Sequence, residues 1–260
     1  EYYSPVLKTL LQIISEINDE SSWDNDLNNT EPCQIALESI DTLFSKFINK
    51  EILIPVYDTV MSVLSNAEST WNLVYTSISA LSSVNFFAMS DLGEERNNSL
   101  LENVSKFMKI ESHPRVRYAI YNFIYNLSIN NKLLFVNDYQ VLIELLEPMI
   151  ISENNPNAKK LAYSAYKAFL CSLGLIQIES CYERFFPYAI DQLQHGPEEF
   201  KIYILRLIVP LLKMAMPNAT SECVNVLKIY NTIYRNSNPN IKAEIINSVA
   251  LISKLLPKHK

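Results

Sequence analysis

The chain has 260 residues, of which 48% are hydrophobic and 19% charged, and its formal net charge is −6 at pH 7. This composition belongs to a folded protein with a sizeable core and excludes an intrinsically disordered chain. No membrane insertion is expected, because the most apolar run, YILRLIVPLLKMAM, is interrupted by Arg206 and Lys213 and falls short of the roughly 18 uncharged residues that a span requires. Since the sequence begins at Glu1 rather than at a methionine, we expect it to be a fragment of a longer chain.

The amino-terminal part carries the excess negative charge. After a helix expected over about residues 2–17, the stretch SEINDESSWDNDLNNTE covers residues 15–31 and is too polar to bury. Between Lys8 and Lys46 there is no Lys or Arg, whereas eight carboxylates occur there: Glu16, Asp19, Glu20, Asp24, Asp26, Glu31, Glu38 and Asp41. Two interpretations remain open. The stretch is either a solvated linker or a loop that contacts a basic partner, with Trp23 as its large anchor and the carboxylates around it.

The rest of the chain is predicted to be helical. Apolar residues recur every three or four positions rather than every two, and no Asn-Gly or Asp-Gly hairpin turn occurs, so an all-α fold is expected. In the segment ESHPRVRYAIYNFIYNLSIN, one stripe runs through Val116, Ile120, Ile124 and Leu127. Comparable stripes begin at Ala36, Leu73, Val116, Ala158, Glu199 and Ile241, with spacings of 37, 43, 42, 41 and 42 residues.

Proline marks the start of most of these helices. Pro114, Pro156, Pro197 and Pro239 each lie two residues before the first stripe position, where a missing backbone N–H costs nothing, and Trp71 takes that place in the second unit. Preceding helices are expected over about 2–17, 51–65, 95–110, 138–152, 179–194 and 219–235.

A period near 42 residues with two helices per unit is typical of HEAT-repeat solenoids. We therefore expect an α-α superhelix of about six helix pairs in one solenoid segment, residues 1–260. The approximate repeat limits are 1–49, 50–90, 94–131, 137–174, 178–216 and 218–257.

Catalytic, cofactor-binding and metal sites are not expected, and the chain is interpreted as no enzyme. Three scattered glycines cannot form a phosphate-binding loop, the three histidines are far apart, and the four cysteines show no CxxC spacing. The cysteines lie in apolar helical patterns, which favours reduced core thiols in the cytosol or nucleus.

Two arginines near the start of one predicted helix, Arg115 and Arg117, raise the question of nucleic-acid binding. The acidic balance of the chain argues against direct nucleic-acid contact. We expect instead a structural ladder of charge pairs between successive repeats, formed by Arg117 and its counterparts Lys159 and Lys242.

Three segments carry a family resemblance: ILIPVYDTVMSVLSNAESTWNLVYTSISALSSV, then HPRVRYAIYNFIYNLS, then NPNAKKLAYSAYKAFL. Together with the preceding acidic loop and its tryptophan, they resemble the central repeats of the karyopherin-β (importin-β family) nuclear transport receptors. The similarity is greatest to the branch that imports ribosomal proteins and histones, and HPRVRYA is its most specific part.

The resemblance implies a longer superhelix of which this chain is the middle part. Its second helices would line the concave face, where basic cargo such as ribosomal proteins or histones and the GTPase Ran bind, and its first helices would meet phenylalanine-glycine nucleoporins. The localisation implied is cytoplasm, nucleus and nuclear pore. Carried over to this sequence, the partner-binding acidic loop comprises Asp19, Glu20, Trp23, Asp24, Asp26 and Glu31.

Two other functions remain open. One is a HEAT scaffold of another class, such as a phosphatase regulatory subunit or a chromosome-organising protein. The other is a helical domain attached to an enzyme whose catalytic part lies elsewhere.

Overall fold

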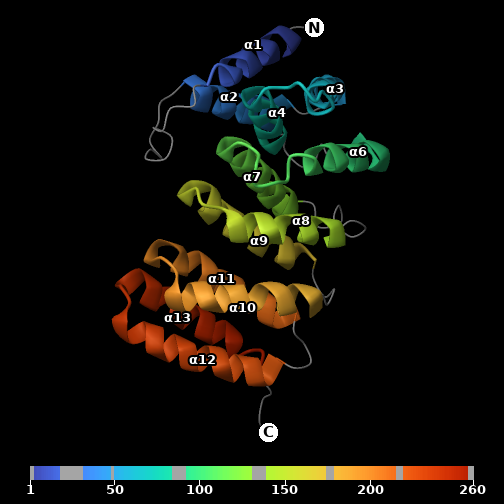
Figure 1. Ribbon diagram of the computed structural model, residues 1–260. Helices are drawn as coiled ribbons and strands as arrows, with labels where there is room; N and C mark the ends of the chain where they lie inside the picture. Colours follow the sequence, from blue (N-terminus) through green and yellow to red (C-terminus); the bar gives the residue numbers. More distant parts are fainter. Residues whose placement is uncertain are drawn as a thin grey trace. The chain divides into compact units, whose positions relative to one another are not determined.

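The computed structural model describes residues 3–17, 32–47, 50–83, 92–130, 139–173, 179–214 and 219–256. In these ranges the regular structure is α-helical throughout (Figure 1), which confirms the all-α prediction. The helices are α1 (Tyr3–Ser15), α2 (Pro32–Phe47), α3 (Lys50–Leu64), α4 (Trp71–Ser83), α6 (Glu94–Ser105), α7 (Pro114–Asn130), α8 (Tyr139–Ser152), α9 (Pro156–Ser172), α10 (Glu179–His195), α11 (Glu198–Met214), α12 (Ala219–Asn236) and α13 (Pro239–Ile252).

These helices follow one another as six consecutive pairs within the described ranges: α1–α2, α3–α4, α6–α7, α8–α9, α10–α11 and α12–α13. The expected first helices agree with the observed ones to within a few residues. The largest difference is at α6, which ends at Ser105 rather than near residue 110. A turn stabilised by main-chain bonds such as Met108 N to Ser105 O follows it.

The predicted proline signal marks three of the second helices directly. Helices α7, α9 and α13 begin at Pro114, Pro156 and Pro239. In α13, the side chain of the preceding residue, Asn238, accepts a hydrogen bond from the Ile241 backbone N–H at 3.0 Å and caps the helix. Proline at the first helical position and an Asn cap before it together fix where the helix starts.

We call the first residue of each predicted apolar stripe its anchor, and two of the predicted anchors are wrong by one residue. Leu73 is 40% exposed whereas Val74 is 2% exposed, and Glu199 is exposed whereas Phe200 is buried. Helix α11 begins at Glu198, one residue after its proline, so its third residue is Phe200, as Val116 is the third residue of α7. The buried anchors of α4, α7, α9 and α11 are then spaced at 42 residues: Val74, Val116, Ala158 and Phe200.

A third stripe position, Val249 in α13, is also wrong, since its side chain is 37% exposed. The neighbouring Ser248 is buried in its place, and its hydroxyl donates a hydrogen bond to the Leu205 carbonyl of α11 at 3.3 Å. A polar residue therefore takes a helix-contact position that the apolar periodicity assigned to valine.

The chain divides into two compact units, residues 1–165 and residues 166–260. In the first unit, α4 packs against α1, α2, α3 and α7, and every residue from Val74 to Ser82 is buried. Two of its buried hydroxyls are satisfied within the helix: the Thr76 hydroxyl donates to the Asn72 carbonyl and the Ser82 hydroxyl to the Ile78 carbonyl. These local bonds allow a helix rich in Ser and Thr to lie inside a core.

In the second unit, α11 packs against α10, α12 and α13. Nearly all of its residues from Ile204 to Leu212 are buried, and Arg206 is the exposed exception. Before this helix, Gly196 allows the tight turn, because a Cβ there would collide with the carbonyl of Gln192.

The cysteines agree with the core prediction at three positions out of four. Cys33, Cys181 and Cys223 are buried, and burial raises the pKa of the Cys223 thiol. Cys171 is exposed, because it lies on the solvent side of α9. Its apolar sequence neighbours Phe169, Leu170 and Leu173 supply the buried contacts of that helical turn.

Candidate functional site

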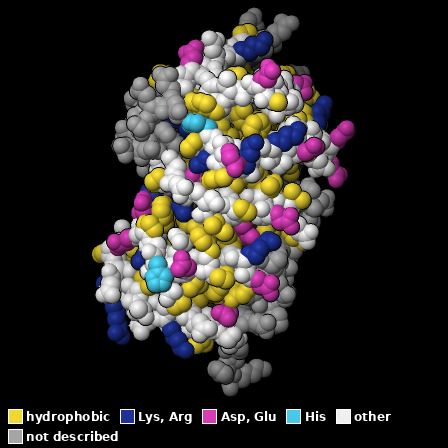
Figure 2. Space-filling view, viewed as in Figure 1, with side chains coloured by type: hydrophobic (Ala, Val, Ile, Leu, Met, Phe, Trp, Pro, Cys, Tyr) yellow, Lys and Arg dark blue, Asp and Glu magenta, His cyan; other side chains and the backbone are white. Residues whose placement is uncertain are grey.

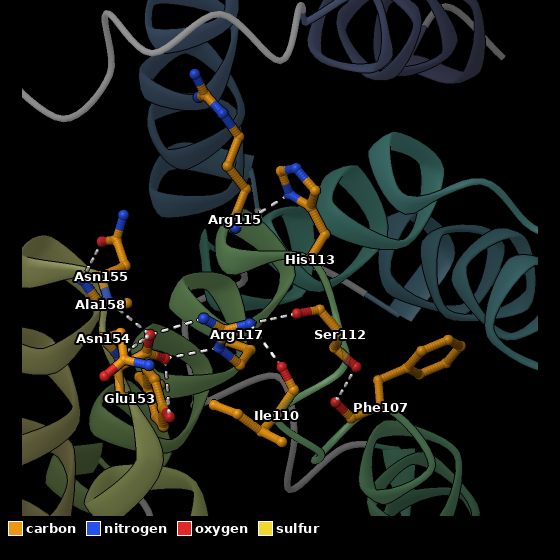
Figure 3. Close-up of polar contacts among 11 residues, drawn as sticks. Phe107, Ile110, Ser112, His113, Arg115, Arg117, Glu153, Asn154, Asn155 and Ala158 are labelled. Carbon is orange, nitrogen blue, oxygen red and sulfur yellow. Dashed lines mark hydrogen bonds and ion pairs between the residues drawn. The ribbon is translucent and has the colours of Figure 1, made fainter.

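A buried ion pair joins two consecutive helix pairs of the first unit (Figure 3). Arg117 Nε donates to Glu153 Oε2 and Arg117 Nη2 donates to Glu153 Oε1, both at 2.7 Å. The two side chains are only 8% and 0% exposed. Arg117 lies in α7 and Glu153 directly follows α8, so this two-pronged contact links one helix pair to the next.

The same guanidinium holds the turn that leads into α7. Arg117 Nη1 donates to the Ile110 carbonyl at 2.9 Å and also to the Ser112 carbonyl. The Ser112 hydroxyl in turn donates to the Phe107 carbonyl at 2.8 Å. One arginine therefore satisfies carbonyl groups of its own turn as well as the carboxylate of the next pair.

Glu153 also organises the start of α9. Its Oε1 accepts hydrogen bonds from the backbone N–H groups of Asn154, at 3.1 Å, and Asn155, at 3.0 Å. Asn155 Oδ1 accepts from the Ala158 N–H at 3.0 Å. A carboxylate at a helix amino terminus is favoured by the helix dipole and by unsatisfied N–H groups, so Glu153 would be stabilised there even before it meets Arg117.

Charges near this pair influence one another. The hydrogen bonds that Arg117 donates to Glu153 raise the pKa of Arg117, and their effect outweighs the opposing effect of burial. Burial raises the pKa of Tyr121, whose hydroxyl lies 3.4 Å from Glu153 Oε2. Burial lowers the pKa of Lys159, and the nearby Glu153 carboxylate partly offsets that effect. The cluster is thus a closed, charged network with Arg117 protonated at every accessible pH.

A second contact joins α4 to α7. The rings of Trp71 and His113 stack with centroids 4.0 Å apart and an interplanar angle of 16°. His113 Nδ1 accepts a hydrogen bond from the Arg115 backbone N–H at 3.2 Å, at the start of α7. In Figure 3 the Arg115 side chain points away from Arg117 and Glu153.

Sequence reasoning missed both Glu153 and this stacked pair. The segment ENNP carried the signal for Glu153, since an acidic residue precedes an Asn-Pro helix start. Nothing in the sequence paired Trp71 with His113, which are 42 positions apart and occupy corresponding places in two repeats.

The predicted site residues are distributed as follows. Lys159 is half-buried near Glu153, and Lys242 Nζ lies 5.5 Å from the ring centroid of Tyr234, in the other helix of its own pair. A structural ladder through Arg117, Lys159 and Lys242 stays a proposal. The acidic-loop residues lie outside the described part of the chain: Asp19, Glu20, Trp23, Asp24, Asp26 and Glu31.

Within the described ranges, no group of three or more His, Cys, Asp or Glu side chains could hold a metal ion. No helix there is long and apolar enough to cross a membrane. In the buried Arg117 cluster the guanidinium and the Glu153 carboxylate bond one another, and this contact links two helix pairs.

The second helices differ in charge along the chain. Helix α2 exposes Glu38 and Asp41, whereas α4, α7 and α9 contain no Asp or Glu. Tyr118, Asn122 and Tyr125 are half-exposed along one side of α7. Figure 2 shows charged side chains of both signs scattered among apolar ones on the face in view. The carboxylates of the described second helices thus lie on α2, α11 and α13, and the three second helices between α2 and α11 have none.

No protein-family model matches the chain, and no curated protein matches it in sequence. Solved structures do match. The crystal structure of Kap121p bound to RanGTP matches with a TM-score of 0.75 at 16% identity, over 95% of this chain and 25% of that one. A multiply substituted variant of Kap121p matches with a TM-score of 0.80 at 16% identity, over 95% and 24% of the two chains.

An engineered protein is also similar, with a TM-score of 0.56 and 12% identity over 95% of this chain and 98% of its own. The chain spans about a quarter of the length of the Kap121p structures. At such low identity the likeness shows the fold. The predicted fold class is therefore confirmed: the chain has the HEAT-repeat solenoid fold of these karyopherin structures.

Proposed function

We propose that this chain is a segment of a karyopherin-β nuclear import receptor that binds basic cargo on the face formed by its second helices. The observation that carries the proposal is the match over 95% of the chain to Kap121p, which has been crystallised with RanGTP, with Nup53p and with Pho4p. The resemblance of HPRVRYA and its flanking segments to the branch that imports ribosomal proteins and histones is a separate, sequence-based support.

Basic cargo is proposed to bind near the amino-terminal end of the segment. Glu38 and Asp41 are exposed on α2, and the acidic stretch of residues 15–31 precedes them in the sequence with further carboxylates. Exposed ion pairs contribute only about 0 to 1 kcal/mol each. Trp23 would therefore have to supply an anchor in addition to the charges.

Cargo release would follow from the flexibility of the solenoid. Each helix pair contacts mainly its neighbours, so small rotations can be distributed along the array, and two ligands that prefer different curvatures compete. In the parent protein, Ran-GTP would favour a curvature with weak cargo binding. First helices are proposed to contact phenylalanine-glycine nucleoporins, and the receptor would move between cytoplasm and nucleus through the nuclear pore.

A HEAT scaffold of another class, such as a phosphatase regulatory subunit or a chromosome-organising protein, is the second candidate. One observation favours it: α4, α7 and α9 carry no carboxylate that could contact a basic cargo.

Pull-downs at low ionic strength separate the two candidates. The immobilised chain is incubated with a lysine-rich import-signal peptide and, separately, with a phenylalanine-glycine repeat segment, each beside a scrambled or serine-substituted control. The transport proposal predicts retention of both test ligands over their controls. If neither is retained, the transport proposal fails and the scaffold function is favoured.

A further inference from the structure

The α12–α13 pair exposes an apolar stripe on α13. Ile246 is 56% exposed and Val249 is 37% exposed, and the neighbouring Ala250 is exposed as well. Lys242 lies on the same side of the helix, and its Nζ is 5.5 Å from the ring centroid of Tyr234 on α12. From Tyr234 the surface continues along α12 at helical spacing. We call the whole surface the tail face: Val224, Leu227, Asn231, Tyr234, Lys242, Ile246, Val249 and Ala250.

The corresponding positions of α11 are buried. With a shift of 41 residues, the buried positions Phe200, Ile204, Leu207 and Leu211 of α11 match the buried positions Ile241, Ile245, Ser248 and Ile252 of α13.

The same shift pairs Ile246 and Val249 with Leu205 and Ile208, which are both 0% exposed. The Leu205 carbonyl accepts the hydrogen bond from Ser248, so this side of α11 faces α13. The tail face therefore repeats, uncovered, the surface that α11 buries against the next helix pair.

The first helix pair exposes a second apolar stripe, on α1. Val6 is 48% exposed, and Leu10, Ile13 and Ile17 are half-exposed. Their spacing of four, three and four residues places them on one side of the helix. We call these four residues the head face.

Helix α8 buries the residues that correspond to the head face. The buried Leu7 and Ile14 of α1 match the buried Ile143 and Ile150 of α8 with a shift of 136 residues. With that shift, the counterparts of Val6, Leu10 and Ile13 are 4%, 0% and 2% exposed: Leu142, Leu146 and Met149.

The last counterpart shows which way this side of α8 faces. Ile17 corresponds to Glu153, which pairs with Arg117 of the preceding helix pair. The head face is thus the side on which a helix pair receives the pair before it. One chain therefore carries both halves of the contact that joins consecutive helix pairs, and both are exposed.

The parts of the chain that carry the two faces differ in charge. Residues 1–47 contain nine Asp and Glu and two Lys, whereas residues 219–260 contain six Lys and Arg and two Glu. Among the described residues, Glu16 beside the head face is exposed, and so are Lys228 and Arg235 beside the tail face. A head face and a tail face attract each other, whereas two tail faces or two head faces repel.

We propose that the tail face of one chain binds the head face of a second copy of the same chain. Helix pairs at the end of a repeat array need a polar outer side to stay soluble, and Lys242 is the one charged member of the two faces. The head-to-tail contact continues the stacking seen between α11 and α13. It is heterologous, so copies would join into an open row. The inference does not depend on the proposed import function.

The test is sedimentation velocity of the 260-residue chain in about 50 mM NaCl, from about 1 µM to about 100 µM. The variant I246D/V249D alters the tail face, and V6D/I13D alters the head face. The matched control V141D/I151D adds the same two charges on α8, where Val141 is 55% and Ile151 43% exposed.

The sedimentation coefficient of the unaltered chain is expected to rise with concentration. Each face variant should associate at least tenfold more weakly, because a carboxylate would be buried against apolar side chains, and the control should stay within about twofold. An equimolar mixture of the two face variants should form one-to-one dimers and nothing larger, since it holds one intact head face and one intact tail face. If circular dichroism shows that a face variant has lost helix, I246S/V249S and V6S/I13S decide, with an expected loss of about threefold.

Several results overturn the proposal. A chain that stays monomeric up to about 100 µM does so, and it would leave the two faces to flanking helix pairs of a longer polypeptide. An equal loss in the control and the face variants would reduce the effect to net charge. Dimers of V6D/I13D alone as strong as those of the unaltered chain, or a variant mixture that stays monomeric, would exclude the head-to-tail contact.

Discussion

The substitution Glu153→Gln tests the buried ion pair of the first unit most directly. The amide keeps the size of the side chain and an oxygen that can still accept from the N–H groups of Asn154 and Asn155, but it leaves the Arg117 guanidinium, 8% exposed, without its carboxylate. Breaking one partner of a buried pair costs about 3 to 5 kcal/mol. Because the side-chain oxygen that caps α9 is retained, we expect a loss at the lower end of this range, about 3 kcal/mol of unfolding free energy.

The chain provides a local probe for this measurement. Both tryptophans, Trp23 and Trp71, lie in the first unit, so tryptophan fluorescence follows that unit during urea unfolding, while circular dichroism follows both. With a urea dependence of about 2 kcal/mol per molar, the fluorescence midpoint should fall by about 1.5 M. Glu144→Gln, an exposed carboxylate on α8, is the matched control and should change the midpoint by less than about 0.3 M.

The double variant R117M/E153L, measured beside the single variants R117M and E153L, forms a double-mutant cycle. It removes both buried charges but also the capping and turn bonds, so it should be about 1 to 2 kcal/mol less stable than the unaltered chain and more stable than Glu153→Gln. Equal stability of Glu153→Gln and its control, or a double variant as unstable as the sum of the single changes, would refute the role given to this pair.

Three further outcomes are expected from stability measurements. Phe200→Ala should lower the free energy of unfolding by about 3 to 5 kcal/mol because it leaves a cavity at a buried position. Glu199→Ala next to it should change that free energy by less than about 1 kcal/mol. Equal effects would contradict the corrected register of α11. Asn238→Ala should destabilise the second unit by about 1 kcal/mol through loss of the α13 cap, and an unchanged urea midpoint by circular dichroism would contradict it. Burial raises the pKa values of Tyr121 and Tyr230 above that of an unfolded tyrosine. Both side chains therefore contribute stability that is fully present below pH 10 and is lost above it, by about 1.4 kcal/mol per pH unit for each. Urea midpoints at pH 9, 10 and 11, measured beside the tyrosinate absorbance at 295 nm, check this, and midpoints that do not change above pH 10 would contradict it.

Much of the fold followed from local chemistry in the sequence. Pro114, Pro156 and Pro239 fix helix starts because proline suits the first helical position. Anchors that follow such prolines at a constant distance, Val116 and Ala158, were placed correctly and are buried.

The register errors have physical causes that pattern alone does not reveal. In α11, Gly196 and Pro197 form a turn that delays the helix by one residue, which moves the anchor from Glu199 to Phe200. In α13, a serine hydroxyl bonded across to α11 makes Ser248 a buried contact, although hydrophobicity favours Val249.

The polar partnerships were harder to predict than the helices. Arg117 was expected to join repeats, but its partner Glu153 lies in a turn 36 residues later, and only the packing of two helix pairs brings them together. Likewise, the distribution of charge over the second helices depends on which side of each helix faces solvent. The sequence shows the acidic amino-terminal part directly, whereas the pairing of Arg206 with Glu244 appears only once the register of α11 and α13 is known.

The measurement closest to the central claim is the affinity of a lysine-rich import-signal peptide for the chain as a function of salt. The unaltered chain is compared with a variant in which Asp19, Glu20, Asp24 and Asp26 are replaced by Asn. We predict that the unaltered chain binds the peptide with a steep salt dependence, and that the variant binds more weakly with a flatter one, because four attractive charges are gone. Absence of binding, or an affinity and salt dependence unchanged by the four substitutions, would contradict cargo recognition by this acidic region.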